Sequence, residues 1–324
     1  MAVNRDKPLD RWTLDIARSV AMYNDWFTRF APEAYRAARV RAAREVEDTL
    51  LATRHLADVG PQVLKARPGV LPTLRMATCP PLAVDRLIGL AGVPRSLVEA
   101  MEQGELPARP SGARLDDELR RIAGVVARLA DPDIVVWRAR GDVPTAEERR
   151  RAATIVADRL CGAVAGSIIR NAQERRQLAV LGGWLEARGY RHLLAGEGTR
   201  LRSMPPGTFG FRLNVPVDRR QDDGTVRKVN VPVNVVVMPK AAQAGELPLL
   251  VETKSAGDFA NVNKRRKEDA ARASQLRHTY GAERVRYILF LCGYFDTGYL
   301  GYAAAEGIDW VWEHRIDDLA ELGL

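Results

Sequence analysis

The hydrophobic pattern of this chain changes from helical to strand-like near residue 190, and this change constrains the fold more than any other feature. Before it, apolar residues recur at three- and four-residue steps, as in residues 10–31. After it, alternating or continuous apolar runs of strand length are separated by turn residues. The pattern predicts an all-α domain over residues 1–165 and an α/β domain, with a central sheet flanked by helices, over residues 166–324.

The N-terminal half shows helical patterns with breaks at proline and glycine. Helices are expected over residues 10–31 and from about residue 33 to 57, separated by Pro32. Residues 81–103 predict two short helices broken at Gly92-Val93-Pro94, which suits either a helix-turn-helix or a plain helical hairpin. In the first case Arg95 would open the second helix, and Arg95 and Arg86 are candidates for contacts with DNA bases.

The C-terminal half predicts a sheet interrupted by helices. A helix ending at Gly189 precedes two strands joined by Asp222-Asp223-Gly224, and this turn is typical of a hairpin. The continuous apolar run after Arg284 predicts a strand buried on both faces, in parallel contact with its neighbour. The expected strands are residues 208–217, 225–238, 249–254, 284–292 and 308–313, with helices at 261–280 and 299–306.

The third of these strands ends in Glu252-Thr253-Lys254. Residues two apart on a strand share a face, so Glu252 and Lys254 point one way and Thr253 the other. Opposite charges at the end of a buried strand are costly unless they serve a site, which favours metal-dependent chemistry. Glu174 falls in line with the apolar stripe of the preceding helix, so it needs a metal, a site opening or a neighbouring arginine.

The charge distribution favours a polyanionic partner. The chain holds 49 Lys and Arg against 41 Asp and Glu, a net charge of +8. Cations crowd the first turn of the helix at 261–280, where the helix dipole disfavours them, and an external polyanion would relieve this repulsion. A solvated helix face is the alternative. The predicted contacts with DNA phosphates are Lys264, Arg265, Arg266, Lys267, Arg272 and Arg277.

Cysteine usage and hydropathy bear on the compartment. The 3 cysteines are far apart and lack zinc-ligand spacing, which is typical of free thiols in a reducing cytoplasm. No apolar signal core is present at the N-terminus, and no run reaches the roughly 18 apolar residues that a spanning helix needs. A soluble, cytoplasmic protein without membrane contact is expected.

A longer set of residues resembles a known family. The element order with Glu-x-Lys on the third strand resembles the PD-(D/E)xK nuclease superfamily. The stretch from Glu252 to Lys267, together with Gln275-Leu276, Leu291-Cys-Gly-Tyr-Phe295 and Ile308-Asp-Trp-Val-Trp-Glu-His314, resembles the XamI family of type II restriction endonucleases. The basic continuation after Lys254 makes this resemblance specific, whereas Glu-x-Lys alone occurs by chance in most proteins.

The resemblance implies a Mg²⁺-dependent enzyme that cuts double-stranded DNA at a short palindromic site as a homodimer. Glu252 would bind the metal, helped by the main-chain carbonyl of Thr253, and Lys254 would position or activate the attacking water. Glu174 matches the place where many such enzymes keep an additional carboxylate. Hard oxygen ligands suit Mg²⁺.

One position departs from the family pattern. An acidic residue is expected on the strand before Glu252, where this chain has Asn234. Three interpretations follow: a functional natural variant, a substitution that prevents cleavage, or another carboxylate, Asp218 or Asp258, as the ligand. Position 234 is favoured, because Asp218 falls near the turn and Asp258 beyond the strand.

Other functions remain open from the sequence. A structure-selective or repair nuclease of the same superfamily would tolerate many DNA sequences. A non-cleaving helix-turn-helix DNA-binding protein would bind specific DNA without cutting it. A lysine-based enzyme acting on small molecules would have no affinity for DNA, and the basic helix argues against it.

Overall fold

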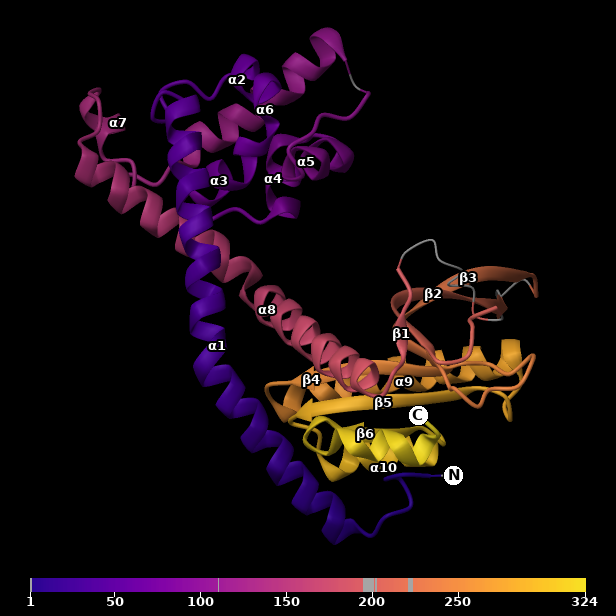
Figure 1. The fold of residues 1–324 in the computed structure, drawn as a ribbon. Coiled ribbons are helices and arrows are strands. Elements are labelled where there is room, and N and C mark those ends of the chain that lie inside the picture. The colour runs from indigo at the N-terminus through magenta and orange to yellow at the C-terminus, as the bar shows by residue number, and fades with distance from the viewer. Residues whose placement is uncertain (1, 110, 195–200, 202, 221–223) are drawn as a thin grey trace. The chain divides into compact units, whose positions relative to one another are not determined.

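The computed structural model describes residues 2–109, 111–194, 201, 203–220 and 224–324 (Figure 1). The chain forms two compact units. The sheet unit comprises Met1–Pro32 and Arg170–Leu324, and the helical unit comprises Glu33–Ile169. The second junction lies close to the expected boundary at residue 165, whereas residues 1–32 group with the sheet instead of with the helices that follow them.

Among the described residues, six strands form one mixed sheet whose spatial order follows the chain. β2, β3 and β4 pair antiparallel, β4, β5 and β6 pair parallel, and β1 pairs parallel with β2. The mixed sheet, the hairpin and the parallel pairing of the apolar strand are therefore confirmed, and β1 is an addition. The bounds are β1 Arg191–His192, β2 Thr208–Arg220, β3 Val226–Met238, β4 Leu249–Ala256, β5 Arg286–Gly293 and β6 Asp309–Trp312.

Helices cover both faces of this sheet. On one face Leu250 and Trp310 pack with Leu276 of α9 (Phe259–Tyr280), and α10 (Thr297–Ala305) joins the same core. On the other face Val251 packs with Leu181 of α8 (Ala146–Ala187), and a 3₁₀ helix, η2 (Glu313–Leu322), contributes to that core. Because alternate strand residues face opposite sides, even-numbered residues of β4 point toward α9 and odd-numbered ones toward α8.

The N-terminal segment belongs to the sheet unit because it is attached to β6. The backbone N–H groups of Val3, Asn4 and Arg5 donate to the buried Asp309 carboxylate. The Trp12 ring packs edge-on against Trp310, with ring centroids 5.2 Å apart. Local sequence patterns do not contain such contacts, since the partners are about 300 residues apart in the chain.

The described part of the helical unit consists of helices and an isolated antiparallel bridge between Thr78 and Ala130. Its core includes Leu71, Leu87 and Trp137, each almost fully buried. The expected break between two short helices is present at Gly92, which has φ of 61° at the end of α4. The elements are α2 Pro61–Ala66, η1 Pro68–Val70, α3 Leu71–Met76, α4 Val84–Ala91, α5 Arg95–Glu102, α6 Gly112–Leu129 and α7 Trp137–Arg140.

Two long helices differ from the sequence-based expectation. α1 (Leu9–Ala52) continues through Pro32, where the sequence predicted an interruption. Proline in a helix removes one backbone hydrogen bond, but the Ala-, Glu- and Arg-rich residues on its C-terminal side favour helix strongly. α8 likewise joins two expected helices into one of 42 residues.

Among the described residues, α8 also passes a length and composition test for a membrane span, with mean hydropathy of 1.5 over 18 residues. A single helix of this kind is weak evidence, because core helices of soluble proteins meet the same criteria. The apolar residues of its C-terminal part pack on the sheet.

Candidate active site

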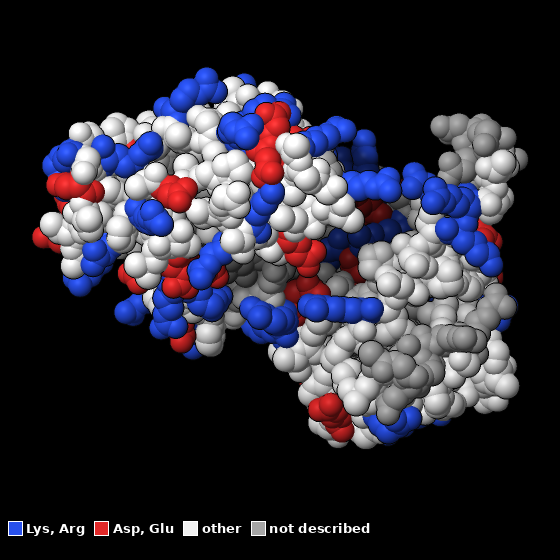
Figure 2. Space-filling view, turned by 90° about the horizontal axis from the view of Figure 1, so that it is seen from above, with Lys and Arg blue, Asp and Glu red and all other residues white. Residues whose placement is uncertain are grey.

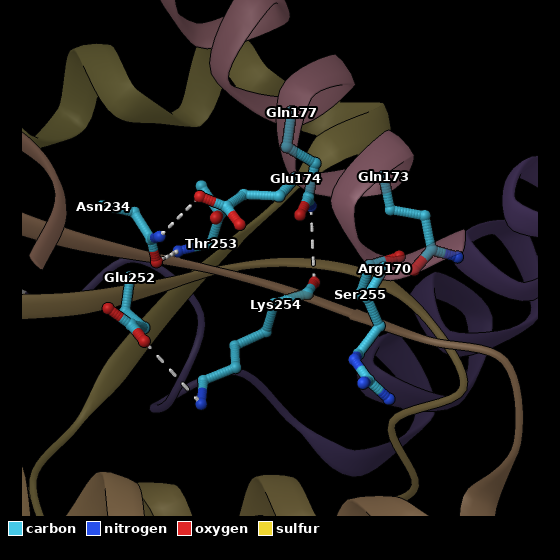
Figure 3. Close-up of a pocket in the computed structure, with 9 residues that line it drawn as sticks. All are labelled: Arg170, Gln173, Glu174, Gln177, Asn234, Glu252, Thr253, Lys254 and Ser255. Carbon is cyan, nitrogen blue, oxygen red and sulfur yellow. Dashed lines mark hydrogen bonds and ion pairs between the residues drawn. The ribbon is translucent and has the colours of Figure 1, made fainter. Parts of the chain in front are cut away.

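β3 and β4, the two central strands of the sheet, separate from each other and thereby open a pocket. Their pairing runs from Val237↔Leu249 to Val235↔Val251. β4 continues beyond this point to Ala256 while paired with β5 on its other edge. The pocket at this fork has a volume of about 200 Å³ (Figure 3). Its lining residues are Arg170, Gln173, Glu174, Gln177, Asn234, Glu252, Thr253, Lys254 and Ser255.

Asn234 bridges the fork with its side chain. Its Oδ1 accepts a hydrogen bond from the Thr253 backbone N–H at 3.0 Å, and only the amide oxygen can accept from that donor. Its Nδ2 then faces Oε1 of Glu174 on α8, in a long contact of 3.5 Å. Asn therefore matches a donor on one side and a carboxylate on the other. An ionised Asp cannot do both, because a carboxylate only accepts.

Glu252 and Lys254 extend from the same face of β4, as strand alternation predicts (Figure 3), and both contact side chains of α9. Oε1 of Glu252 lies 3.9 Å from Nζ of Lys254 and accepts a hydrogen bond from Arg272. Nζ of Lys254 lies 2.7 Å from Oδ1 of Asp269. The second oxygen of Asp269 accepts from the Tyr299 hydroxyl at 2.9 Å. Two acids and two bases thus form one largely buried network between β4 and α9.

Burial dominates the electrostatics of this network. It raises the pKa of Glu252, and the positive charges of Lys254 and Arg272 lower it only in part. Burial also raises the pKa of the neighbouring Tyr287 hydroxyl well above its ordinary value, so this phenol is neutral at physiological pH. The Glu252 carboxylate is therefore incompletely compensated, and a further cation beside it would favour its charged form.

The α8 side of the pocket is held by two polar side chains. Nε2 of Gln177, which is almost fully buried, donates to the backbone oxygens of Lys254 and Phe290, at 3.3 and 3.4 Å. One turn earlier, Oε1 of Glu174 accepts from Nε of Arg212 at 3.1 Å. Two of the three sequence-based accounts of Glu174, a partner arginine and a site opening, therefore apply to it.

The structure brings the residues predicted for catalysis and metal binding into one pocket. These residues are Glu174, Asn234, Glu252, Thr253 and Lys254. Among the described lining residues, neither of the alternative carboxylates is present. Asp218 stands opposite Lys228 in the hairpin, and Asp258 follows β4. Position 234 is therefore the one that the geometry places beside Glu252.

The basic residues predicted for DNA binding have different surroundings. Arg272 contacts Glu252 inside the network. Arg277 donates hydrogen bonds to the backbone oxygens of Glu306 and Gly307, at 2.6 and 2.8 Å. The Arg266 guanidinium lies over the Tyr302 ring, 5.2 Å from its centroid, and Lys267 is exposed. The side chains of Lys264 and Arg265 lie outside the described part of the chain.

The two arginines proposed as base readers lie in the helical unit. Arg86 is exposed, whereas Arg95 pairs with Asp85 at 2.7 Å and with Glu99 at 3.3 Å. Figure 2 shows Lys and Arg scattered over most of the face in view, with Asp and Glu between them. Total charge alone therefore does not mark out one DNA-binding surface there.

Sequence reasoning gave no role to Asp269, Gln177 or Arg212, which contact residues of this site. Asp269 lies on the buried face of α9 with Ala273 and Leu276, so the argument applied to Glu174 would have found it. Gln177 also follows Glu174 by one helical turn and faces the sheet. Arg212 gives no such signal, because its approach to Glu174 depends on an irregularity of β2.

Comparison with known proteins identifies the class. Residues 54–312 match the family model of the XamI restriction endonuclease. Type II restriction enzyme SalI of Streptomyces albus G is 50% identical over 321 residues, covering 99% of each chain. The crystal structure of protein VC1899 from Vibrio cholerae matches 86% of this chain, which spans 56% of that one, with 12% identity and a TM-score of 0.27. So low a score supports no argument.

These matches place the protein among the site-specific endonucleases of type II restriction systems. The chain belongs to the XamI restriction endonuclease family. The resemblance inferred from the Glu252 segment is thereby confirmed.

Proposed function

We propose that this protein hydrolyses phosphodiester bonds of double-stranded DNA at a short palindromic site, with Mg²⁺ as cofactor. The observation that carries the proposal is the pairing of Glu252 with Lys254, 3.9 Å apart, in a pocket that also contains Glu174 and Asn234. A carboxylate and an ammonium two residues apart on a strand, beside further oxygen ligands, support assignment to the PD-(D/E)xK superfamily.

The donor atoms of the pocket fit Mg²⁺. Glu252, Glu174 and the Asn234 amide oxygen are hard ligands, and the Thr253 carbonyl would supply a fourth. Within the described residues no group of three His, Cys, Asp or Glu could hold a metal ion. A Mg²⁺ ion here would therefore be held by one or two carboxylates, neutral oxygens and several waters. The partly uncompensated charge of buried Glu252 independently favours a cation there.

Each residue has a distinct part in the proposed reaction. Bound Mg²⁺ would supply Lewis-acid stabilisation of the charge that develops on the phosphate. Lys254 would hold the attacking water by a hydrogen bond from its ammonium group and offset negative charge nearby. Asp269 fixes the direction of that ammonium, and Arg272 keeps the Glu252 carboxylate in place.

Roles in dimerisation, DNA recognition and phosphate binding are proposed for other parts of the chain from the class of reaction. A homodimer would present two such pockets to the two strands of a palindromic site. The helical unit, with its α4–α5 pair, would contribute to DNA recognition, dimerisation or both. Lys264, Arg265 and Lys267 would contact phosphates, so affinity should fall steeply with salt. We place the enzyme in the cytoplasm, where its free thiols remain reduced.

Plasmid digestion tests the proposal. The purified protein is incubated with plasmid DNA in Mg²⁺ or in EDTA, and the fragment ends are sequenced. Discrete fragments with one shared end sequence are expected in Mg²⁺, and none in EDTA. Glu252→Gln should remove cleavage while retaining DNA binding. A smear of unrelated ends would instead indicate a structure-selective nuclease, and binding without cleavage a non-cutting DNA-binding protein.

A further inference from the structure

Arg212 has a backbone conformation that strands seldom contain. It lies within β2 with φ of 54°. This is the left-handed region, which residues other than glycine rarely adopt. Such conformations persist only where the surrounding fold holds them, and they are concentrated at functional sites.

β2 exchanges its two faces at Arg212. Phe209 and Phe211 pack in the core beside α8, whereas Leu213 and Val215 pack in the core beside α9. Residues two apart in a regular strand share a face, so all of these odd-numbered residues would otherwise point the same way. The left-handed residue therefore reverses the strand at this level.

β3 reverses at the same level. Val233 packs in the α9-side core and Val235 in the α8-side core, with Asn234 between them. The pairing register continues unchanged, from Phe211↔Val235 to Leu213↔Val233. The reversal is thus shared by the hairpin, and it places Arg212 level with the residue that bridges the fork.

Close packing against α8 supports this arrangement. A Cβ atom at Gly182 would lie 3.1 Å from Cζ of Phe211, closer than carbon atoms normally approach. The missing side chain at Gly182 lets the Phe211 ring reach α8, immediately before the left-handed residue. The left-handed conformation of Arg212 is therefore supported by α8, which also carries Glu174, just over two turns before Gly182.

The ion pair made by Arg212 does not account for this strained backbone. Its Nε lies 3.1 Å from Oε1 of Glu174, but the two side chains are 62% and 32% exposed. Ion pairs this exposed contribute little to stability, because solvent screens them and side-chain entropy opposes them. The left-handed conformation directs the largely exposed guanidinium of Arg212 toward the Glu174 carboxylate at the pocket.

We propose that Arg212 binds a non-bridging oxygen of the DNA phosphate at the cut site. This assignment rests on the proposed nuclease function and adds a catalytic residue that touches the substrate. A guanidinium presents several N–H donors in a plane that matches a phosphate, and it keeps its charge at any physiological pH. Its exposure leaves it accessible to a DNA strand entering the pocket.

Charge pairing supports a change of ionic partners for Arg212 and Glu174 when DNA binds. In the free protein Arg212 neutralises Glu174, and Asn234 faces the same oxygen. With substrate and a divalent cation both bound, Glu174 would hold the cation and Arg212 would hold the phosphate. Each charge then has an opposite partner before and after binding, so neither state leaves a charge unpaired at the pocket.

The test distinguishes the effect of the Arg212 guanidinium on cleavage from the effect of its backbone conformation on stability. Arg212→Gly removes the side chain and places there the residue that tolerates positive φ, so thermal stability should be unchanged or higher. Arg227→Gly is the matched control, because Arg227 is an exposed arginine on the other strand of the same hairpin.

Two measurements are made once the parent's cut site has been mapped. Single-turnover cleavage at saturating protein should fall roughly 100-fold in Arg212→Gly, the effect of losing one preorganised donor, and remain near the parent rate in Arg227→Gly. Affinity is then measured with Ca²⁺ in place of Mg²⁺, as a hard divalent cation that also takes oxygen ligands. The DNA carries either a normal or a neutral methylphosphonate group at the cut position. The parent and Arg227→Gly should lose affinity for the neutral DNA, whereas Arg212→Gly should show no further loss.

The outcomes distinguish this inference from the proposed function. A parent chain that cuts no DNA in Mg²⁺ overturns both. A parent that cuts, with an Arg212→Gly variant that cleaves within about twofold of it, overturns only the role of Arg212. Additive losses from Arg212→Gly and the neutral phosphate also overturn it, because two groups in contact must show coupled effects. A thermal transition of Arg212→Gly well below the parent's would show a structural role instead.

Discussion

Replacing Asp269 with Asn removes the negative charge that faces Lys254 while leaving the shape of the side chain unchanged. The Asn amide can still accept the hydrogen bond from the Tyr299 hydroxyl. The two charged side chains lie 2.7 Å apart and are only 11% and 3% exposed. The substitution therefore leaves a largely buried ammonium group with Glu252 as its remaining partner, 3.9 Å away and already paired with Arg272.

The size of the effect follows from this geometry. At the 2.7 Å separation the attraction is about 6 kcal/mol with an effective dielectric constant near 20. Breaking one side of a buried pair typically costs roughly 3–5 kcal/mol. Because Glu252 compensates Lys254 in part, we expect the lower end, about 3 kcal/mol. For a unit of this size that corresponds to a fall in Tm of roughly 6–12 °C.

Thermal unfolding monitored by circular dichroism measures this change. Glu268→Gln, an exposed neighbour on the same helix, is the control and should shift Tm by no more than about 2 °C. The double variant Lys254→Met with Asp269→Asn should recover most of the stability, because it removes both charges together, while remaining unable to cut DNA. A fall of less than about 2 °C in Asp269→Asn alone would refute the reasoning that these charges form a tightly coupled pair.

Three further changes test other parts of the molecule. Asn234→Asp adds a negative charge beside Glu174, so it should lower Tm in EDTA and enlarge the Tm increase that Mg²⁺ produces; an equal increase in both proteins would contradict a metal at this fork. Burial raises the pKa of the Cys292 thiol to about 12, and the reactive form is the thiolate, so a thiol reagent at pH 8 should label exposed Cys79 quickly and Cys292 only after unfolding. Asp309→Ala removes the acceptor for the N–H groups of Val3, Asn4 and Arg5, and urea unfolding should show a loss of roughly 2–4 kcal/mol.

The sequence was sufficient for strands β2 to β6, but not for β1, and for the pocket residues that follow a regular pattern. Strand alternation placed Glu252 and Lys254 on one face, and the helical stripe placed Glu174 beside the sheet. These inferences succeed because each needs only a repeat within one element. The same argument extended to α9 would have identified Asp269, whose position is in line with Ala273 and Leu276.

Other features depend on contacts between distant segments. The reversal of faces at Arg212 breaks the alternation on which strand prediction rests, and it is supported by a glycine about 30 residues earlier, in α8. Hydrogen bonds from residues 3–5 to Asp309 attach the N-terminal segment to the sheet unit. Its helical pattern had placed it in the all-α domain instead. Pro32 favoured a helix end, but its neighbours continue the helix through it.

The attachment of the N-terminal segment to β6 also bears on how the enzyme is made. Val3 leaves the ribosome 306 residues before its partner Asp309. Strands β2 to β5 can pair with their chain neighbours as they emerge, since the sheet follows sequence order. Residues 3–5 therefore cannot bind Asp309 until nearly the whole sheet has been translated. For a restriction endonuclease, this order delays completion of the sheet unit until β6 has been synthesised.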